Sequence, residues 1–278
     1  KPDNYSEESV DQVLSSLTEK EDTKGERPNI IMIQLESFFD VDYVKGLSFS
    51  QDPLPVFHRL EREYSSGLLT VPTVGAGTVN TEFEVLTGMR QRDFGVSEYP
   101  YKTVLKSTPV ESISTNLGKL GYRSHAVHNN EATFYGRNKV FANLGFDTFT
   151  SMEYMNGLTE NPNGWSNDDI LAREIIKTLD STEGSDLTVG ITVQSHGKYD
   201  GIEMTEEQKI KVSGAPEGME SSYQYYVNEL YEVDQMIGDL IKRLEKRDEK
   251  SVLVLYGDHL PSLGLEKEDL TNGSLYQT

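Results

Sequence analysis

The chain has 278 residues, a net charge of −20 and no cysteine. The acidic balance argues against a nucleic-acid-binding protein and against a polybasic membrane surface, because both need positive charge. The lack of cysteine excludes disulfides, thiolate metal sites and cysteine nucleophiles. Hydrophobic residues make up 36% of the chain, which suffices for a packed core. An anionic substrate would need a metal ion or a few well-placed cations to offset the negative field.

The first 28 residues form a polar, acidic segment, in which residues 8–17 are expected to form a short helix before a charged linker. The sequence becomes globular at residue 29, so we expect one catalytic domain over residues 29–278. The first residue is Lys1, which indicates a processed or excised piece. No apolar run approaches the roughly 18 residues of a membrane span.

Short apolar, β-branched runs alternate with helical patterns after residue 29. Strands are predicted at residues 30–35, 67–71, 122–127, 187–193 and 251–256. Helices are predicted at residues 81–86, 112–120, 170–179 and 222–246, the last with apolar residues at three- and four-residue spacing. This alternation predicts an α/β fold with a mostly parallel central sheet and helices on both faces. The polar segment 199–220 is expected to be a surface excursion near the site.

Metal-ligand and acid–base residue types follow four of the predicted strands. They are Glu36, His128, His196, and the Asp258-His259 pair. Ligands of open α/β sheets bind at the carboxyl ends of the strands, where these residues would meet. Taken singly, each carboxylate could be a helix cap and each histidine a satisfied loop residue. Together, two carboxylates and an imidazole at one sheet edge indicate a divalent metal site.

A glycine-rich run, residues 75–77, leads into Thr78 at or near the start of a helix. A helix N-terminus favours an anion such as phosphate, because its backbone N–H groups are unpaired and its dipole end is positive. Thr78 is also an ordinary N-cap candidate. With a metal ion nearby, its hydroxyl can instead become a nucleophile.

The stretch from His128 to Arg137 offers a histidine, aromatic residues and an arginine soon after a strand. Arg137 could bind phosphate with its forked guanidinium, or it could be a surface residue paired with a carboxylate. Phe134 and Tyr135 could equally be core aromatics. Four further polar residues are interpreted as structural, and they are His58, His125, Asp168 and Asp169.

Five blocks, taken together, resemble the lipoteichoic acid synthases and their phosphoglycerol transferase relatives in the alkaline phosphatase–sulfatase superfamily. In chain order they are residues 33–38, 77–84, 128–147, 195–196 and 256–259. The resemblance covers roughly residues 29–263. It implies a sulfatase-type fold that holds Mn²⁺, with Mg²⁺ or Zn²⁺ as alternatives.

The positions that match the family's motifs imply a role for each residue. The implied metal ligands are Glu36, Thr78, Asp258 and His259, and Thr78 and His196 are the implied catalytic residues. The implied substrate-binding residues are His128, Tyr135, Arg137 and His196. Tyr135 stands where these synthases commonly carry tryptophan, which is a departure from the family pattern.

The resemblance also implies the reaction and its setting. Phosphoglycerol would pass from an anionic, phosphatidylglycerol-like glycerophospholipid, through a Thr78-linked intermediate, to a polyglycerolphosphate-type acceptor in lipoteichoic acid-type polymer synthesis. The parent protein would be a monomer anchored at the extracellular face of a Gram-positive cell membrane by helices outside this chain. Because the chain ends soon after His259, the family's domain would be incomplete at its C-terminus.

Two other functions stay open at this stage. A hydrolase on the same scaffold, a phosphodiesterase or a sulfuric ester hydrolase, would use water as acceptor. The chain lacks cysteine and has no serine motif around Thr78 that could be converted to formylglycine, as many sulfatases require. A non-catalytic lipid or polymer sensor would not need a complete set of ligands and nucleophile.

Overall fold

The computed structural model describes residues 6–16, 25–95, 98–200, 202 and 210–278. Five strands form one sheet in the order β4-β3-β5-β1-β7, and every pairing is parallel. They are β1 (Asn29–Leu35), β3 (Arg123–His128), β4 (Thr148–Ser151), β5 (Asp186–Ile191) and β7 (Ser251–Gly257). A second, antiparallel pair joins β2 (Ser48–Phe49) to β6 (Val212–Ser213). The predicted α/β fold with a mostly parallel sheet is confirmed.

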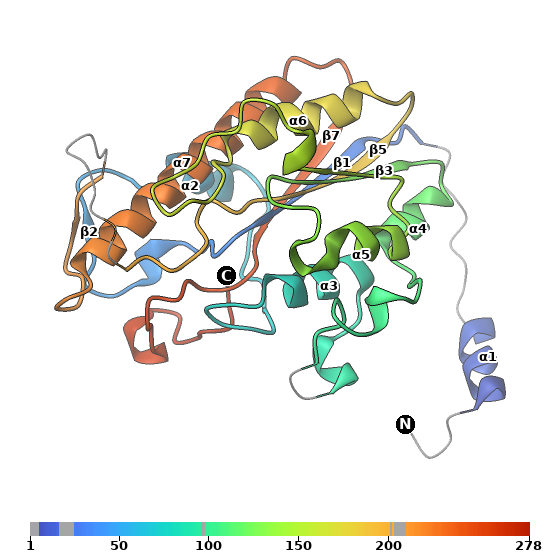
Figure 1. Cartoon of the computed structure of the whole chain (residues 1–278), viewed down its shortest axis with the longest axis horizontal. Helices are drawn as coiled ribbons and strands as arrows, with labels where there is room; N and C mark the ends of the chain where they lie inside the picture. The colour runs from blue at the N-terminus through green and yellow to red at the C-terminus, as the bar shows by residue number, and fades with distance from the viewer. Residues whose placement is uncertain (1–5, 17–24, 96–97, 201, 203–209) are drawn as a thin grey trace.

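Helices cover both faces of this sheet (Figure 1). On one face, α6 (Asp169–Asp180) packs against α7 (Glu220–Leu244), and α7 contacts α2 (Pro55–Glu63). The other face carries α3 (Thr78–Thr87), α4 (Ile113–Gly118) and α5 (Arg137–Asn143). Helix α1 (Glu7–Ser16) buries none of its residues. Among the helices of the described ranges, none is both long and apolar enough to cross a bilayer.

The central strand β1 serves two cores because its side chains alternate between the sheet faces. Ile31 and Ile33 belong to the core with α6 and α7, whereas Met32 belongs to the core with α3 and α5. Gln34 also reaches the second side, where its amide donates to the carbonyl of Thr78 at 3.3 Å. The sheet therefore fixes the first residue of α3.

The predicted strand at residues 67–71 is wrong. This segment makes a single isolated bridge, between Thr70 and Gln277. Its backbone pairs with the last residues of the described chain, since Leu69 exchanges hydrogen bonds with Thr278 at 2.9 and 3.0 Å. It therefore never reaches the central sheet. The structure also contains α2, α5 and β4, which the sequence analysis did not identify.

The segment 199–220 is only partly the surface excursion that the sequence suggested. Tyr199 and Ile210 are buried at 2% and 0% exposure, and both belong to the core under α7. Residues 201 and 203–209 lie outside the described part of the chain, as does Leu17 at the end of the predicted first helix. The burial of Tyr199 and Ile210 thus holds the described parts of segment 199–220 against the core.

Gly257, at the end of β7, is required by a close backbone approach. A Cβ atom at this position would overlap the carbonyl oxygen of Phe38 and lie 3.0 Å from the Cβ of Thr278. Backbone atoms cannot move aside as a flexible side chain can. Only glycine therefore fits between β7 and the chain that leaves β1.

We expect Gly257→Ala to destabilise the fold by about 1–3 kcal/mol, the usual cost of overpacking. For a domain of this size the melting temperature should fall by roughly 2–4 °C for each kcal/mol. The control is Gly118→Ala in α4, where a Cβ meets no atom within 4 Å. Differential scanning calorimetry measures both, and equal melting temperatures for Gly257→Ala and wild type would contradict the packing argument.

Candidate active site

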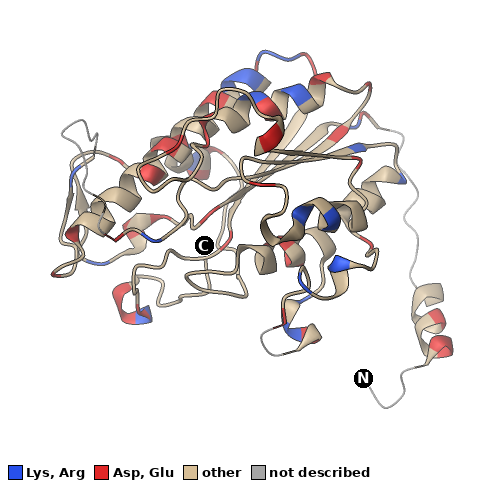
Figure 2. Cartoon of the chain, in the orientation of Figure 1, with Lys and Arg blue, Asp and Glu red and all other residues tan. Residues whose placement is uncertain are grey.

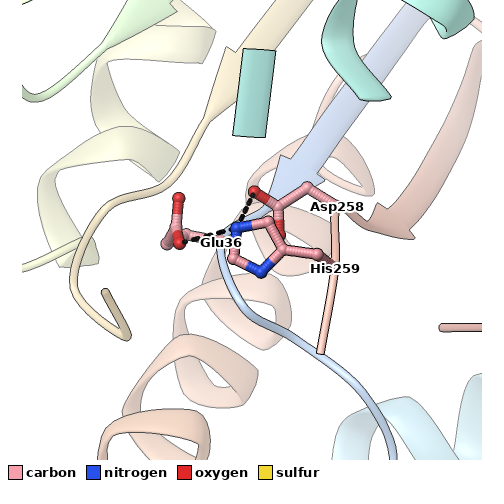
Figure 3. A group of neighbouring side chains, drawn as sticks. All are labelled: Glu36, Asp258 and His259. Atoms are coloured by element: carbon pink, nitrogen blue, oxygen red, sulfur yellow. Dashed lines mark ion pairs between the residues drawn. The ribbon is translucent and has the colours of Figure 1, made fainter. Parts of the chain in front are cut away.

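Two neighbouring strands bring three polar residues to one point of the sheet edge. In the parallel pairing of β1 with β7, Leu35 lies opposite Gly257. The next residue of each strand, Glu36 and Asp258, therefore leaves the sheet beside the other, and His259 follows. Figure 3 shows these three side chains turned toward one another. Three of the five residues inferred from strand ends, Glu36, Asp258 and His259, thus converge in space.

Thr78, the first residue of α3, joins this group. Its hydroxyl donates to Glu36 Oε2 at 2.9 Å and lies 3.5 Å from His259 Nε2. The same Nε2 is 3.6 Å from Glu36 Oε1 and 3.5 Å from Asp258 Oδ2. All four residues are buried, with exposures of 4% or less. They form a compact set of donor atoms shielded from water.

Hydrogen bonds around the set leave its donor atoms aimed inward. His259 Nδ1 lies 2.9 Å from the carbonyl of Leu260, so Nδ1 carries the proton and the Nε2 lone pair faces the carboxylates. Asp258 Oδ1 accepts from the backbone N–H of Ser37 at 2.7 Å. Asp258 Oδ2 is buried and has no hydrogen-bond partner among the described residues. An orphaned buried carboxylate oxygen calls for a cation.

The protonation of the site supports the same conclusion. Burial, followed by repulsion from Glu36, raises the pKa of Asp258 to about 8. Burial lowers the pKa of His259, but attraction from Asp258 and Glu36 outweighs that effect and the pKa is raised overall. The buried carboxylates of Glu36 and Asp258 lie close enough to repel each other unless a proton or a metal ion lies between them.

The spacing of the donor atoms fits a divalent cation. Four ligands about 2.1 Å from a tetrahedral ion stand about 3.4 Å apart. The three separations measured from His259 Nε2 are 3.5, 3.5 and 3.6 Å. Carboxylate, hydroxyl and imidazole donors suit Mn²⁺, Mg²⁺ or Zn²⁺. The residues proposed as metal ligands from the sequence therefore form a group that can hold the ion.

Glycine and helix geometry place Thr78. Gly77 is the N-cap residue of α3 and has φ +98°, a left-handed conformation that favours glycine. Thr78 therefore occupies the first helical position, and its hydroxyl bonds to Glu36 rather than capping the helix. The alternative that Thr78 is an ordinary N-cap is wrong. Thr81, one turn later, donates to the carbonyl of Asp258 at 2.6 Å and ties α3 to the end of β7.

Backbone strain is concentrated at this edge of the sheet. Among the described residues, the non-glycine positions with positive φ are Ser37 at +49° and Tyr135 at +55°. Ser37 follows Glu36, and its hydroxyl donates to Glu36 Oε1 at 2.8 Å. Tyr135 is close enough that the Glu36 and Asp258 carboxylates contribute to its raised pKa, after the larger effect of burial. Such conformations persist where the surrounding contacts enforce them, often at functional sites.

Arg137 lies in a second polar cluster behind the first. It is 1% exposed, and its Nη2 donates to Glu82 Oε2 at 2.8 Å. Tyr101 donates to the other oxygen of Glu82 at 2.5 Å. Glu82, one helical turn after Thr78 on α3, was not singled out in the sequence. The one feature that could have drawn attention to Glu82 is that a carboxylate lies on a helix face that is buried.

His128 is held in its neutral form. Its Nδ1 donates to the carbonyl of Ile191 at 2.9 Å, and its Nε2 lies 3.2 Å from Arg137 Nη1. Burial and the charge of Arg137 hold the pKa of His128 well below its usual range. A neutral histidine with both nitrogens engaged cannot act as an acid. His196 differs, since it is only partly buried and, in the described part of the chain, its ring makes one hydrogen bond, from Nδ1 to the carbonyl of Gly197.

The polar residues interpreted as structural also have partners. Asp168 precedes α6 but does not cap it, because its carboxylate accepts from the backbone of Val193 and Gln194 and from Asn129. His125 lies 2.8 Å from Thr148 Oγ1 and 3.3 Å from Asp186. His58 Nδ1 lies 2.8 Å from Asp52. The contacts of Asp168 and His125 join neighbouring strands and loops.

Taken together, the parallel α/β sheet and the hydroxyl–carboxylate–imidazole set at its carboxyl edge define an α/β protein with a candidate divalent-metal site beside a buried hydroxyl. Residues 28–278 match the family described as Sulfatase. The chain therefore belongs to the sulfatase family.

Several known proteins are similar to this chain. A Rhizobium meliloti protein named for cyclic β-1,2-glucan modification is 30% identical over 94% of the chain, which spans 40% of that protein. Lipoteichoic acid synthase 2 of Bacillus subtilis is 26% identical over 85% of the chain and 36% of its own length. The Streptococcus pyogenes phosphoglycerol transferase GacH, solved with sn-glycerol-1-phosphate, shares the fold with a TM-score of 0.81. That alignment has 24% identity and covers all of this chain and 75% of GacH.

We expect cation binding to be stronger and more stabilising at pH 8 than at pH 6. Because the folded-state pKa of Asp258 is raised above its unfolded value of 3.8 to about 8, the metal-free fold loses stability as pH rises between these values. A bound cation replaces that proton. Melting curves with EDTA or with Mn²⁺ should diverge as pH rises, and Glu36→Gln should reduce the divergence. Equal shifts at both pH values would contradict the site.

We expect Glu82→Gln to destabilise the protein by about 3–5 kcal/mol, because it leaves the buried Arg137 charge uncompensated. The matched control is Glu111→Gln, which removes an exposed pair with Lys119 and should cost less than about 1 kcal/mol. Urea denaturation compares the two variants. Similar small losses would show that Arg137 does not depend on Glu82.

Proposed function

We propose that this chain is the catalytic domain of a metal-dependent phosphoglycerol transferase in which Thr78 is the nucleophile. One observation carries the proposal, namely the buried Thr78 hydroxyl that lies 2.9 Å from Glu36 and 3.5 Å from His259 at the N-terminus of α3. A divalent cation held by Glu36, Asp258, His259 and Thr78, which the sequence resemblance suggests is Mn²⁺, would acidify the hydroxyl and offset negative charge on phosphate. The family and the phosphoglycerol transferase fold of GacH support this chemistry.

The proposed reaction has two displacements at phosphorus. Thr78 Oγ1 passes its proton to Glu36 Oε2, to which it already donates, and attacks the phosphorus of a phosphatidylglycerol-like lipid. The bond from phosphorus to the diacylglycerol oxygen breaks, and His196 donates a proton to that oxygen. An acceptor hydroxyl then attacks the phosphothreonine and passes its proton to His196, while the bond from phosphorus to Thr78 breaks and Thr78 takes its proton back from Glu36. In this scheme Tyr135 and the Arg137–His128 pair line the site beside the phosphate.

The chain can supply positive charge for the lipid phosphate despite its acidic composition. Between residues 90 and 139 eight cations face four acids: Arg90, Arg92, Lys102, Lys106, Lys119, Arg123, Arg137 and Lys139 against Asp93, Glu98, Glu111 and Glu131. In Figure 2 the ribbon is coloured blue, for lysine and arginine, at several positions around η2 (Gln91–Phe94), η3 (Val104–Lys106) and α5. Because Arg137 is already paired with Glu82, the exposed Lys102 is the better placed cation, and its ammonium lies 4.8 Å from the centre of the Tyr99 ring and 5.4 Å from that of Tyr135.

The proposed setting follows from the lipid donor. A protein that uses a membrane lipid would work at the membrane, and we place it at the outer face. We also propose that segments beyond this chain anchor it and that it acts as a monomer. The sequence resemblance suggests a polyglycerolphosphate-type acceptor in a Gram-positive cell. The relative named for glucan modification suggests a saccharide acceptor as the alternative.

A hydrolase of the same family is the second candidate, because family membership alone does not distinguish water from another acceptor. Product analysis separates the two. A transferase attaches glycerophosphate to the acceptor, whereas a phosphodiesterase releases free glycerophosphate at the same rate whether or not an acceptor is present.

We expect Thr78→Ala to abolish turnover, a loss of at least about 10³-fold, because no other hydroxyl holds its position. Thr78→Ser keeps a hydroxyl and should retain measurable activity. Release of diacylglycerol from a fluorescent phosphatidylglycerol measures turnover, and circular dichroism confirms folding. Full activity in Thr78→Ala would remove Thr78 as the nucleophile.

We expect Lys102→Glu to raise the KM for the lipid donor about tenfold at low ionic strength, with the effect shrinking as salt screens the charge. Lys119→Glu is the matched control, since Lys119, the C-cap residue of α4, is 68% exposed and pairs with Glu111. Loss of activity to the same extent in both variants would point to net charge rather than to the position of Lys102.

A further inference from the structure

A second group of metal-ligand residue types lies where α2 meets the chain that leaves β1. Asp40 and Asp42 come four and six residues after Glu36, and His58 lies on α2. One donor atom from each of Asp40, Asp42 and His58 lies within 4.8 Å of the other two. The proposed reaction uses none of these three residues, so they form a separate candidate site.

The His58 ring has one nitrogen engaged and the other directed at the two carboxylates. Its Nδ1 lies 2.8 Å from Asp52 Oδ1, so in the neutral ring Nδ1 carries the proton and Nε2 carries the lone pair. Nε2 lies 3.4 Å from Asp40 Oδ1 and 3.9 Å from Asp42 Oδ2. The Nε2 atom is buried, yet it makes no hydrogen bond with any group in the described part of the chain. A buried ring nitrogen without a hydrogen bond between two carboxylates calls for a ligand.

Contacts with the backbone hold His58 in this orientation. Asp52 Oδ1 also accepts from the backbone N–H of Leu54 at 2.9 Å, so the acceptor for Nδ1 is itself fixed. The buried Asp234 on α7 accepts from two backbone N–H groups in the first turn of α2, at 2.8 and 3.0 Å. A carboxylate on the far nitrogen is the usual second partner of a histidine that binds metal. The ring is therefore oriented as a metal-binding histidine is.

The local backbone also holds the two carboxylates close together. Asp40 is the N-cap residue of the short helix η1 (Val41–Tyr43), and its Oδ1 accepts from the backbone N–H of Asp42 at 2.9 Å. Burial, followed by repulsion from Asp40, raises the pKa of Asp42, and Asp52 adds to the rise while His58 opposes it. Three carboxylates thus surround one imidazole, and a divalent cation would relieve their repulsion.

The donor set and its spacing favour Zn²⁺. Imidazole suits Zn²⁺ better than it suits Mg²⁺ or Ca²⁺, and Zn²⁺ also binds carboxylate oxygen. Ligands of a tetrahedral zinc ion stand about 3.4 Å apart, and His58 Nε2 lies 3.4 Å from Asp40 Oδ1. The side chain of Asp42 is 56% exposed, so it can rotate to shorten its longer separation. A water molecule would complete the four ligands.

We propose that Asp40, Asp42 and His58 form a second metal site, which binds Zn²⁺, and that Asp52 orients the histidine. A bound ion would join α2 to the chain that leaves β1, four residues after Glu36. Its role is to stabilise the fold, and it takes no part in the transfer of phosphoglycerol. The proposal therefore does not depend on the proposed function. In the alternative, a protonated His58 pairs with the two carboxylates and no ion binds.

Counting bound zinc tests the proposal. The full chain is stripped with EDTA and titrated with Zn²⁺ by equilibrium dialysis, and the bound metal is measured by mass spectrometry. We expect His58→Ala to bind one Zn²⁺ fewer than wild type, and Asp42→Asn to weaken that site at least about tenfold. Circular dichroism confirms that both variants fold.

Asp239→Asn is the matched control for charge, because it removes one exposed carboxylate on α7 that pairs with Arg243. It should leave both the zinc count and the affinity unchanged. Wild-type count and affinity in His58→Ala would overturn the proposal. Equal weakening in Asp239→Asn and Asp42→Asn would also overturn it, because the zinc would then follow net charge rather than this site.

Glu36→Gln separates this site from the candidate active site. In the Glu36→Gln variant, Zn²⁺ at about 100 times its Kd should raise the melting temperature by about 5 °C, and adding His58→Ala should remove the rise. If Glu36→Gln alone removes the same zinc that His58→Ala removes, the chain has one site and the proposal fails. Failure of Thr78→Ala to abolish turnover would overturn the proposed function and leave this site unaffected.

Discussion

The parallel pairing of β1 with β7 is the constraint on which the candidate active site depends. It sets Leu35 opposite Gly257, so the chain leaves both strands at the same level and the carboxylates of Glu36 and Asp258 emerge side by side. A shift of one residue in this register would turn one carboxylate toward the opposite face of the sheet. Gly257 secures the register because only hydrogen fits against the Phe38 carbonyl. The chemistry at the edge is thus a consequence of backbone geometry.

The repulsion between these carboxylates is the cost of that arrangement. Both are buried, and the rise in the pKa of Asp258 expresses how strongly a second negative charge is disfavoured there. The surrounding groups do not relieve the repulsion fully. Ser37 donates to both side chains, yet Asp258 Oδ2 stays unpaired in the described structure. The site therefore favours positive charge, and a bound cation would supply it.

Much of this organisation could be predicted from the sequence. Apolar strands followed at once by Glu36, His128, or Asp258-His259 indicate a sheet edge, because carboxyl ends of parallel strands meet there. The pairing partners of weaker segments could not be predicted. Residues 67–71 look like any other strand, but they bond to the last residues of the chain instead of the sheet. Local composition does not encode which distant segment a strand will meet.

The charge and exposure of individual side chains could not be predicted from the sequence either. Whether Arg137 is free to bind phosphate depends on Glu82, 55 residues earlier, whose carboxylate it contacts in the fold. The contact between Trp165 and His196 likewise joins two loops with no shared motif. Motifs suggested which residues matter, while the three-dimensional contacts decided which of them are charged, neutral or exposed.

The hydroxyl at the N-terminus of α3 has a practical consequence for the biology of this chain. Sulfatases that depend on formylglycine need a separate enzyme to modify the nucleophile after translation. If Thr78 is the nucleophile, as proposed, it is already in its working form after translation, so maturation would require only folding and an ion and no dedicated activating enzyme.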